Sequence, residues 1–197
     1  MNNPLLSILI LAAGASKRLG QAKQLVRYKG GSLIQNAVDT AHSIAPREII
    51  VITGSNAKAV KDAARMSPVR WLHNPDWSTG MGGSIALGAA AISTKSKGLM
   101  ILLCDQWRIQ TQDLSEFAEI WQSDPKRIVC AESEGLLMPP AIFPSSCFKQ
   151  LRQLEGSQGA RSIFHAHPEL LRPVFIKNAV FDLDTKNQLA ELKNLDP

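Results

Sequence analysis

The chain has 197 residues, of which 45% are hydrophobic and 20% are charged. This length suits one domain with one core, and the composition is that of an ordinary folded protein without a disordered tail. The net charge of +5 favours an anionic partner, but the basic residues are scattered and only 6% of residues are aromatic, which argues against an extended nucleic-acid surface.

The cysteine content indicates a reducing compartment, and the hydropathy of the chain indicates neither a signal peptide nor a membrane anchor. Cys104, Cys130 and Cys147 are odd in number and form no C-x-x-C pair, which argues against a disulfide scaffold and a structural zinc site. The apolar run 5–13 is too short to span a bilayer, and no basic residue precedes it. We therefore expect a cytoplasmic protein with no membrane partner.

Strand and helix patterns alternate along the first two thirds of the chain. The continuous apolar run 7–13 predicts a strand that is buried on both faces. Ser32 is expected to cap a helix that ends near residue 41. The expected elements that follow are strand 48–53, helix 56–66, strand 69–72, helix 84–92, strand 98–104, helix 112–122 and strand 127–131.

The last third is less regular. It contains Pro139-Pro140 and the apolar residues 141–143, with expected helices near 145–154 and 160–166, a strand near 173–176 and a helix after Asp184. The repeated alternation predicts a single α/β domain with a doubly wound, mostly parallel sheet and helices on both faces. Ligands of such sheets bind beyond the carboxyl ends of the strands.

The loop after the first strand is basic and rich in small residues. Segment 11–23 reads L-A-A-G-A-S-K-R-L-G-Q-A-K, so backbone N–H groups can approach an anion while Lys17, Arg18 and Lys23 add charge. Its spacing is neither G-x-G-x-x-G nor G-x-x-x-x-G-K-[ST], which argues against a dinucleotide fingerprint and a P-loop. A solvated basic turn is the alternative that composition leaves open.

This loop resembles the L-A-A-G-x-S-x-R-[ML]-G-x-x-K signature of the molybdenum cofactor cytidylyltransferase-like (MocA/MobA-like) NTP transferases, and every signature position is present. The resemblance extends over residues 8–189. It implies a Rossmann-like nucleotidyltransferase fold, also called the nucleotide-diphospho-sugar transferase fold. It further implies that phosphates are bound by Arg18 and Lys23, that Lys23 stabilises charge during transfer, and that nucleotide is held by Leu11, Ala12, Ala13 and Gly14.

The loop 74–84 reads N-P-D-W-S-T-G-M-G-G-S and can wrap a nucleoside with its main chain, with Ser84 capping the helix that follows. A plain structural turn is an equally good interpretation of the residues alone. The segment resembles the family pattern N-x-x-W-x-x-G-M-x-x-S, which implies nucleoside binding by Gly80, Gly82 and Ser84. Trp77 can stack on a ligand, although packing is the commoner role of tryptophan.

Two carboxylates are candidate metal ligands. Asp105 ends the strand 98–104 and resembles the Asp of the family segment L-x-D-Q-P, which binds Mg2+, although the proline is replaced here by Trp107. A helix cap or a turn is the alternative for Asp105. Segment 181–189 resembles D-[IV]-D-T-x-x-D-[LY], which implies that Asp182 or Asp184 lies near the metal, and we favour Asp184. Mg2+ held by two carboxylates can orient and polarise an α-phosphate.

The acceptor side departs from the family pattern. Segment 154–161 resembles L-x-G-D-x-G-A-R, which implies that Arg161 meets an anionic acceptor, but Ser157 stands in place of the aspartate. Met138 replaces the second glycine of G-x-x-G-x-P-x-L-F. Together with Trp107, these changes bear on which acceptor is used more than on nucleotidyl transfer itself.

The resemblance implies a Mg2+-dependent enzyme that transfers CMP from CTP to molybdopterin and releases pyrophosphate, with Lys23, Arg18 and Asp105 as catalytic residues and a molybdoenzyme as a possible partner. A sugar- or polyol-phosphate nucleotidyltransferase is one alternative. A catalytically silent nucleotide-binding chaperone for a cofactor is another, but retention of the whole clamp argues against it. A dehydrogenase is disfavoured because Thr53-Gly54 stands where the second strand should end in an acidic residue.

Overall fold

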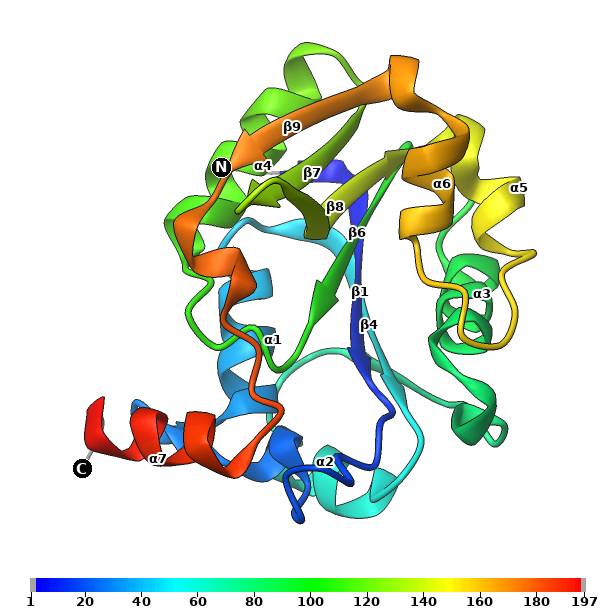
Figure 1. The fold of residues 1–197 in the computed structure, drawn as a ribbon. Coiled ribbons are helices and arrows are strands. Elements are labelled where there is room, and N and C mark those ends of the chain that lie inside the picture. Colours follow the sequence, from blue (N-terminus) through cyan, green and yellow to red (C-terminus); the bar gives the residue numbers. More distant parts are fainter. Residues whose placement is uncertain (1–2, 196–197) are drawn as a thin grey trace.

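The computed structural model describes residues 3–195 of the chain. A seven-stranded sheet runs through the molecule (Figure 1). The strand order is β5-β4-β1-β6-β8-β7-β9. The strands are β1 (Asn3–Ala12), β4 (Pro46–Thr53), β5 (Arg70–His73), β6 (Gly98–Leu103), β7 (Ile128–Ser133), β8 (Leu136–Pro144) and β9 (Leu171–Phe175). Only β8 pairs antiparallel with its neighbours in this sheet, so the predicted mostly parallel, doubly wound α/β fold is confirmed.

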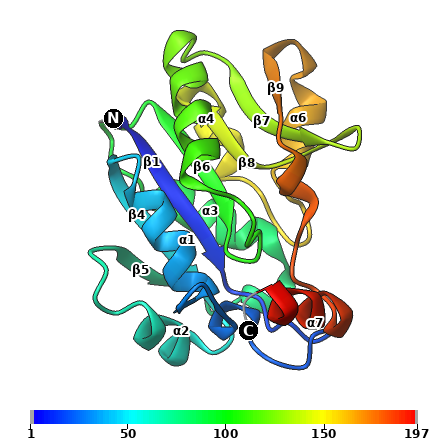
Figure 2. The ribbon, with the colours of Figure 1, turned by 90° about the vertical axis from the view of Figure 1, so that its left-hand side faces the viewer.

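Helices cover both faces of the sheet (Figures 1 and 2). The first face carries α1 (Leu33–His42), α2 (Ala57–Ala63) and α4 (Thr111–Ser123), and the second carries α3 (Met81–Ala91), α5 (Phe148–Leu151) and α6 (Arg161–Ala166). The remaining elements are α7 (Lys186–Leu195), the short strands β2 (Arg27–Tyr28) and β3 (Gly31–Ser32), and the 3-10 turns Lys23–Leu25, Trp77–Thr79, Ser145–Cys147, Pro168–Leu170 and Lys177–Val180.

The two large cores follow from the alternation of side chains along β1. Ile8 and Ile10 pack toward α1 and α4, whereas Leu9 and Leu11 pack toward α3. Because successive residues of a strand point to opposite faces, a continuous apolar run is what a strand between two helical layers requires. The strand predicted at 7–13 is therefore explained by burial on both sides.

A third, smaller core joins segments that are distant in sequence. Its buried members are Leu19, Val26, Leu33, Leu183 and Leu192, with Tyr28, Trp107 and Leu189 packed against them. These residues come from the first loop, the start of α1, the loop after β6 and the carboxyl-terminal segment. This core therefore holds together the segments that carry Arg18, Lys23, Asp105 and Asp184.

The structure corrects three details of the predicted elements. Segment 136–144, expected to be irregular, is strand β8. Helix α3 begins at Met81, so Ser84 lies inside it and Gly80 occupies the N-cap position. The helix expected near 145–154 is shorter, a 3-10 turn followed by α5. By contrast, Ser32 caps α1 as predicted, because its hydroxyl oxygen accepts a hydrogen bond from Gln35 N at 3.2 Å.

All three cysteines are buried free thiols. Burial raises the pKa of Cys104 above its usual range and raises that of Cys130 to about 12, so both stay protonated and unreactive. Within residues 3–195, the helices are too short or too polar to cross a bilayer.

Candidate active site

The carboxyl ends of β1 and β6 lie side by side at one edge of the sheet. Leu11 of β1 is in register with Leu103 of β6. The chain goes from β1 to β4 on one side and returns to β6 on the other, which makes this edge a switch point where α/β sheets bind ligands. A cavity of about 160 Å³ opens here, lined by Leu11, Ala12, Ala13, Gly14, Lys23, Gln24, Trp77, Gly80, Met81, Ser84, Leu103, Cys104 and Asp105.

Most of the predicted nucleotide-binding residues line this cavity. Arg18 and Gly82 are the two that do not. Arg18 is exposed on the first loop, and the backbone N–H of Gly82 donates to Gly156 O at 2.9 Å. The Gly82 amide is therefore used within the protein, and its part in nucleoside binding remains a proposal.

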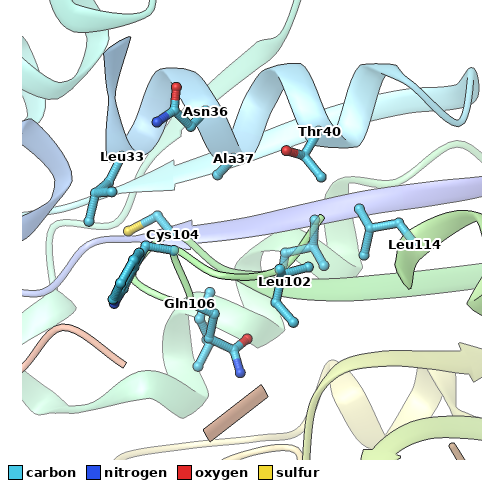
Figure 3. A pocket seen from close by; sticks show the side chains of 11 residues that line it. Leu33, Asn36, Ala37, Thr40, Leu102, Cys104, Gln106 and Leu114 are labelled. Atoms are coloured by element: carbon cyan, nitrogen blue, oxygen red, sulfur yellow. The ribbon is translucent and has the colours of Figure 1, made fainter. Parts of the chain in front are cut away.

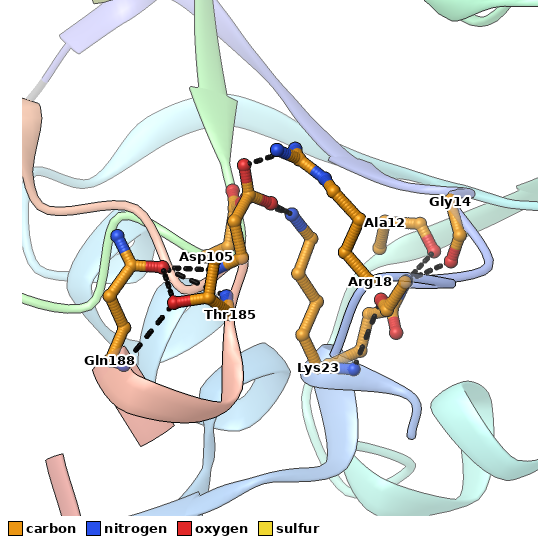
Figure 4. A network of polar contacts seen from close by, with 10 residues as sticks. Ala12, Gly14, Arg18, Lys23, Asp105, Thr185 and Gln188 are labelled. Carbon is orange, nitrogen blue, oxygen red and sulfur yellow. Dashed lines mark hydrogen bonds and ion pairs between the residues drawn. The ribbon is translucent and has the colours of Figure 1, made fainter. Parts of the chain in front are cut away.

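Gln24 shapes the first loop, and sequence reasoning did not identify it. Its side chain is only 1% exposed, and its amide nitrogen donates to Ala12 O at 3.0 Å and to Gly14 O at 2.8 Å (Figure 4). The two carbonyl oxygens lie at the end of β1 and in the loop beyond it. Gln24 therefore fixes how the loop leaves the strand, a role that only these non-local contacts reveal.

We predict that Gln24→Leu weakens NTP binding about tenfold, because leaving these carbonyl oxygens without a donor costs about 1–3 kcal/mol and loosens the loop. Calorimetric titration with CTP measures the change. Gln21→Leu, an exposed glutamine in the same loop, should bind CTP like the wild type. Equal affinity in Gln24→Leu and Gln21→Leu would contradict the role given to Gln24.

The second loop is pressed against the segment before α6. Gly80 has a φ of 138°, and a Cβ at this residue would lie 2.1 Å from Gly156 O. Ser84, inside α3, accepts a hydrogen bond from Asn74 Nδ2 at 3.0 Å. Trp77 packs against the second core and also lines the cavity, so its packing role is compatible with contact to a ligand.

We predict that Gly80→Ala destabilises the protein by roughly 1–3 kcal/mol, because the methyl group needs both a strained φ and a displaced neighbouring backbone. Thermal unfolding measures this change. The matched variant is Gly83→Ala in the same helix, where an added Cβ meets only Asn74 Nδ2 at 3.8 Å. Gly83→Ala should be neutral or stabilising because alanine favours helix, and the opposite order of stabilities would contradict this account.

Charged side chains form a network of polar contacts (Figure 4), and two of them, Lys23 and Asp105, line the cavity. The ammonium group of Lys23 donates to Asp105 Oδ2 and, at 3.0 Å, to Asp184 Oδ1. The guanidinium group of Arg18 donates to Asp184 Oδ2 at 2.6 Å. Four residues predicted to act together are thus joined through three segments that are far apart in sequence.

The electrostatics keep this cluster charged. Burial lowers the pKa of Lys23, but the carboxylates of Asp105 and Asp184 outweigh it and raise that pKa above its ordinary value. Burial also raises the pKa of Asp184. The positive charges of Lys23 and Arg18 outweigh that effect, so the pKa of Asp184 is lower than its ordinary value. Lys23 is therefore protonated and Asp184 ionised at neutral pH.

Backbone contacts hold the two aspartates in place. Leu183 N donates to Asp105 O at 3.1 Å. The side-chain oxygen of Gln188 accepts hydrogen bonds from Asp184 N at 2.9 Å and from Thr185 N at 2.8 Å. Gln188 N donates to Thr185 Oγ1 at 3.3 Å. These contacts fix the start of α7, where Thr185 acts as a cap, and they hold Asp184 facing Lys23.

The two aspartates suit a hard divalent cation. Asp105 and Asp184 both reach the single ammonium group of Lys23, so one positive charge can be held between them. Residues 3–195 contain no group of three or more His, Cys, Asp or Glu side chains that could hold a metal alone. A cation here needs further oxygens from phosphates and water, which is how Mg2+ is usually bound.

A second cavity of about 320 Å³ adjoins the first, since Leu103 lines both. Its other lining residues are Gln106, Glu134, Leu136, Met138, Pro139, Arg161, Val180 and Asp182. Of the departures from the family pattern, Met138 lies in this cavity. Trp107 does not line it and packs edge-on against Tyr28, with ring centroids 5.0 Å apart. Ser157 is exposed beside Gly80.

Asp182 faces this second cavity. Burial and the nearby charge of Asp105 raise the pKa of its carboxyl group to about 7, although Lys23 and Arg161 oppose the shift. No residue within 3–195 donates a hydrogen bond to its Oδ1 atom. Asp182 is thus distinct from Asp184, which is fully engaged with Lys23 and Arg18.

A third cavity, between α1 and β6, is too small for a substrate. It measures about 40 Å³, and Cys104 lines it beneath Leu33 and Asn36 of α1 (Figure 3). A space of this size holds one or two water molecules. We therefore assign it no substrate.

The fold and the site together define an α/β domain of the nucleotidyltransferase type, with a basic loop after β1 and a carboxylate after β6. A family model described as the MobA-like NTP transferase domain matches residues 8–170. The chain belongs to the MobA-like NTP transferase family, which confirms the predicted resemblance.

Three relatives match along most of their length. Nicotine blue oxidoreductase of Paenarthrobacter nicotinovorans is 40% identical over 96% of this chain and 97% of its own. Purine catabolism protein PucB of Bacillus subtilis is 30% identical over 83% of this chain and 82% of its own. Molybdenum cofactor cytidylyltransferase of Escherichia coli is 24% identical over 94% of both chains.

Solved structures share the fold. Rv0371c from Mycobacterium tuberculosis superposes with a TM-score of 0.85 at 23% identity, covering 98% of both chains. Its complex with manganese gives 0.81 at 21% identity, covering 95% of this chain and 97% of the other. A nucleotidyl transferase from Methanothermobacter thermautotrophicus, Mth528, gives 0.82 at 18% identity, covering 97% of both chains.

Proposed function

We propose that this protein transfers a nucleoside monophosphate, CMP from CTP, to a phosphorylated acceptor, with molybdopterin as the favoured acceptor. The observation that carries the proposal is the cluster in which Arg18 and Lys23 of the first loop meet Asp105 and Asp184. The cytidylyltransferase of Escherichia coli supports the choice of base and acceptor.

In the proposed reaction, an oxygen of the acceptor phosphate attacks the α-phosphorus of the NTP. The bond from that phosphorus to the bridging oxygen of the β-phosphate breaks, and pyrophosphate leaves with the electron pair. The protein supplies no nucleophile and provides positive charge and orientation instead. Lys23 and Arg18 stabilise the charge on the phosphoryl oxygens, and the first loop holds the triphosphate through its backbone N–H groups.

Asp105 and Asp184 are the proposed metal ligands. A bound Mg2+ would polarise the α-phosphate and orient it for attack. The manganese complex of the structural relative is consistent with a divalent metal in this fold. A cation held by Asp105 and Asp184 would neutralise the two carboxylates that Lys23 contacts, and the ammonium group of Lys23 would then be available to bind phosphate.

An oxidoreductase is the second candidate, because the relative at 40% identity is named nicotine blue oxidoreductase. The site offers less support for a dinucleotide cofactor. The first loop lacks the G-x-G-x-x-G spacing, and the residue after β4, where such enzymes place an acid, is Gly54. A Cβ at Gly54 would lie 2.4 Å from Trp77 Cβ, so no side chain fits there.

Pyrophosphate release tests the proposal. The purified protein is incubated with Mg2+, each of the four NTPs in turn, and either molybdopterin or sugar and polyol phosphates. Release that requires both CTP and molybdopterin is the expected result. Release with a sugar phosphate would support the alternative nucleotidyltransferase, and NTP binding without release would support a silent cofactor chaperone for a molybdoenzyme. A parallel assay of NADH and NADPH oxidation, with nicotine blue as the electron acceptor, tests the oxidoreductase candidate, which predicts that the coenzyme is oxidised.

A further inference from the structure

The charges of the residues that line the second cavity do not match those of a site for a phosphate group alone. Among residues 3–195, Arg161 is the only basic residue that lines this cavity, against the two acidic residues Glu134 and Asp182. A phosphate bound deep in this cavity would meet net negative charge. The phosphate of an acceptor is better placed toward Leu103, where the cavity adjoins the first one and its charge cluster.

Two buried oxygens of the lining residues lack hydrogen-bond donors within residues 3–195: Gln106 Oε1 and Asp182 Oδ1. Gln106 is only 6% exposed. Its amide nitrogen is held by Pro139 O at 2.7 Å and Ala179 O at 2.8 Å, so its orientation is fixed. A buried acceptor without a donor is costly, and a ligand that supplies N–H or O–H groups offsets that cost.

We infer that the second cavity binds the body of the acceptor, and that Asp182, supported by Gln106, selects a body rich in N–H or O–H donors. The inference rests on the proposed function, because it assigns the acceptor of the same site. It favours a phosphorylated molecule whose body is polar and uncharged over one with an apolar or polyanionic body. A pterin-type ring and a polyol share this chemistry, and both carry several donors.

The inference extends the earlier assignment of Arg161. Arg161 starts α6, and Asp182 follows the turn Lys177–Val180, so the two residues approach the cavity from different segments. An acceptor that spans them places its donors against Asp182 and any further anionic substituent near Arg161. Asp182 is then a specificity residue that touches the acceptor and no part of the NTP.

Calorimetric titration tests this inference on the whole chain, loaded with Mg2+ and the non-transferring analogue cytidine 5′-(α,β-methylene)triphosphate. Three probes are titrated: molybdopterin, D-erythritol 4-phosphate and phenyl phosphate, whose body has no donor. We expect at least one donor-bearing probe to bind about tenfold or more tightly than phenyl phosphate. Preference for molybdopterin would identify a ring as the source of the donors, and preference for erythritol phosphate would identify a polyol.

The variants Asp182→Leu and Asp182→Asn show whether Asp182 carries this selection. Asp182→Leu should weaken the preferred probe about tenfold to hundredfold and Asp182→Asn by less, since the amide keeps a neutral acceptor oxygen. Phenyl phosphate and CTP-analogue affinities should change by no more than about twofold, as in the exposed control Glu119→Gln on α4. Unchanged thermal unfolding and analogue binding show that the variants are folded.

The inference is overturned if phenyl phosphate binds as well as the other probes, if neither donor-bearing probe binds, or if Asp182→Leu leaves the preferred probe unaffected. Pyrophosphate release is measured in parallel with CTP. Pyrophosphate release with an acceptor whose affinity is unchanged by substitution of Asp182 would contradict the inference and leave the proposed function standing. Binding that depends on Asp182 without any release would contradict the transfer reaction and leave the acceptor assignment standing.

Discussion

In Lys23→Ala, kcat is expected to fall about 10²- to 10³-fold, the usual cost of removing a charged donor from a transition-state oxyanion. The ammonium group of Lys23, which lines the first cavity, contacts the carboxylates of both Asp105 and Asp184, so the substitution removes the positive charge at that point. Single-turnover kinetics with CTP and acceptor measure the chemical step, apart from product release.

Lys17→Ala is the matched control, because Lys17 is an exposed lysine of the same loop. It should keep the turnover of the wild type within about twofold. Equal turnover by Lys23→Ala and Lys17→Ala would remove Lys23 from the mechanism. Thermal unfolding shows whether Lys23→Ala remains folded, and its midpoint should lie close to that of the wild type. It is measured with Mg2+ present, so that the cation offsets the negative charges of Asp105 and Asp184.

Asp105→Asn is expected to have an effect of similar size. The amide keeps the shape of the side chain but removes a negative charge, so it weakens the binding of a divalent cation. The polarisation that the bound cation would provide is worth several kcal/mol, or about 10²- to 10³-fold in rate. Mn2+ affinity, measured by electron paramagnetic resonance in the presence of CTP, should fall together with kcat.

Asp76→Asn is the control for this change. Asp76 is an exposed aspartate in the second loop, outside the lining of the first cavity, and its substitution should leave Mn2+ affinity and kcat unchanged. If Asp105→Asn bound Mn2+ as tightly as Asp76→Asn and retained full turnover, Asp105 would act as a structural residue at the end of β6.

The parallel half of the sheet could be predicted because burial on two faces leaves a strong pattern in the sequence. Strands β1, β4 and β6 each contain a continuous apolar run, and the helices between them carry apolar residues at helical spacing. Their order along the chain and the rules for parallel connections then predict one edge where the loops meet. The loops after Ala13 and Cys104 do meet there.

Strand β8 could not be predicted because its two consecutive prolines interrupt the sequence pattern of a strand. Pro139 and Pro140 fall at a shift of register, between the pairs Ala131–Met138 and Cys130–Ala141. Proline lacks the N–H group that a sheet ladder needs and is tolerated where the ladder is interrupted. A local reading of Pro139-Pro140 therefore predicts a loop, whereas the pairing with β6 and β7 makes a strand.

The charge cluster was predictable as a set of residues but not as a geometry. The motifs brought Arg18, Lys23, Asp105 and Asp184 together through a family resemblance, and the structure joins them by hydrogen bonds. What holds the segments in register is the small third core, whose members are scattered from Leu19 to Leu192. Contacts of this kind leave no periodic pattern, because each segment contributes only one to three residues.

Transfer of label from CTP is the measurement that tests the central claim most directly. CTP radiolabelled at the α-phosphorus is incubated with the protein, Mg2+ and molybdopterin, and both the labelled acceptor and the pyrophosphate are quantified. The account predicts one pyrophosphate for each labelled acceptor, with both products lost in Lys23→Ala. Tight binding of CTP with neither product formed from molybdopterin or any sugar or polyol phosphate would contradict it.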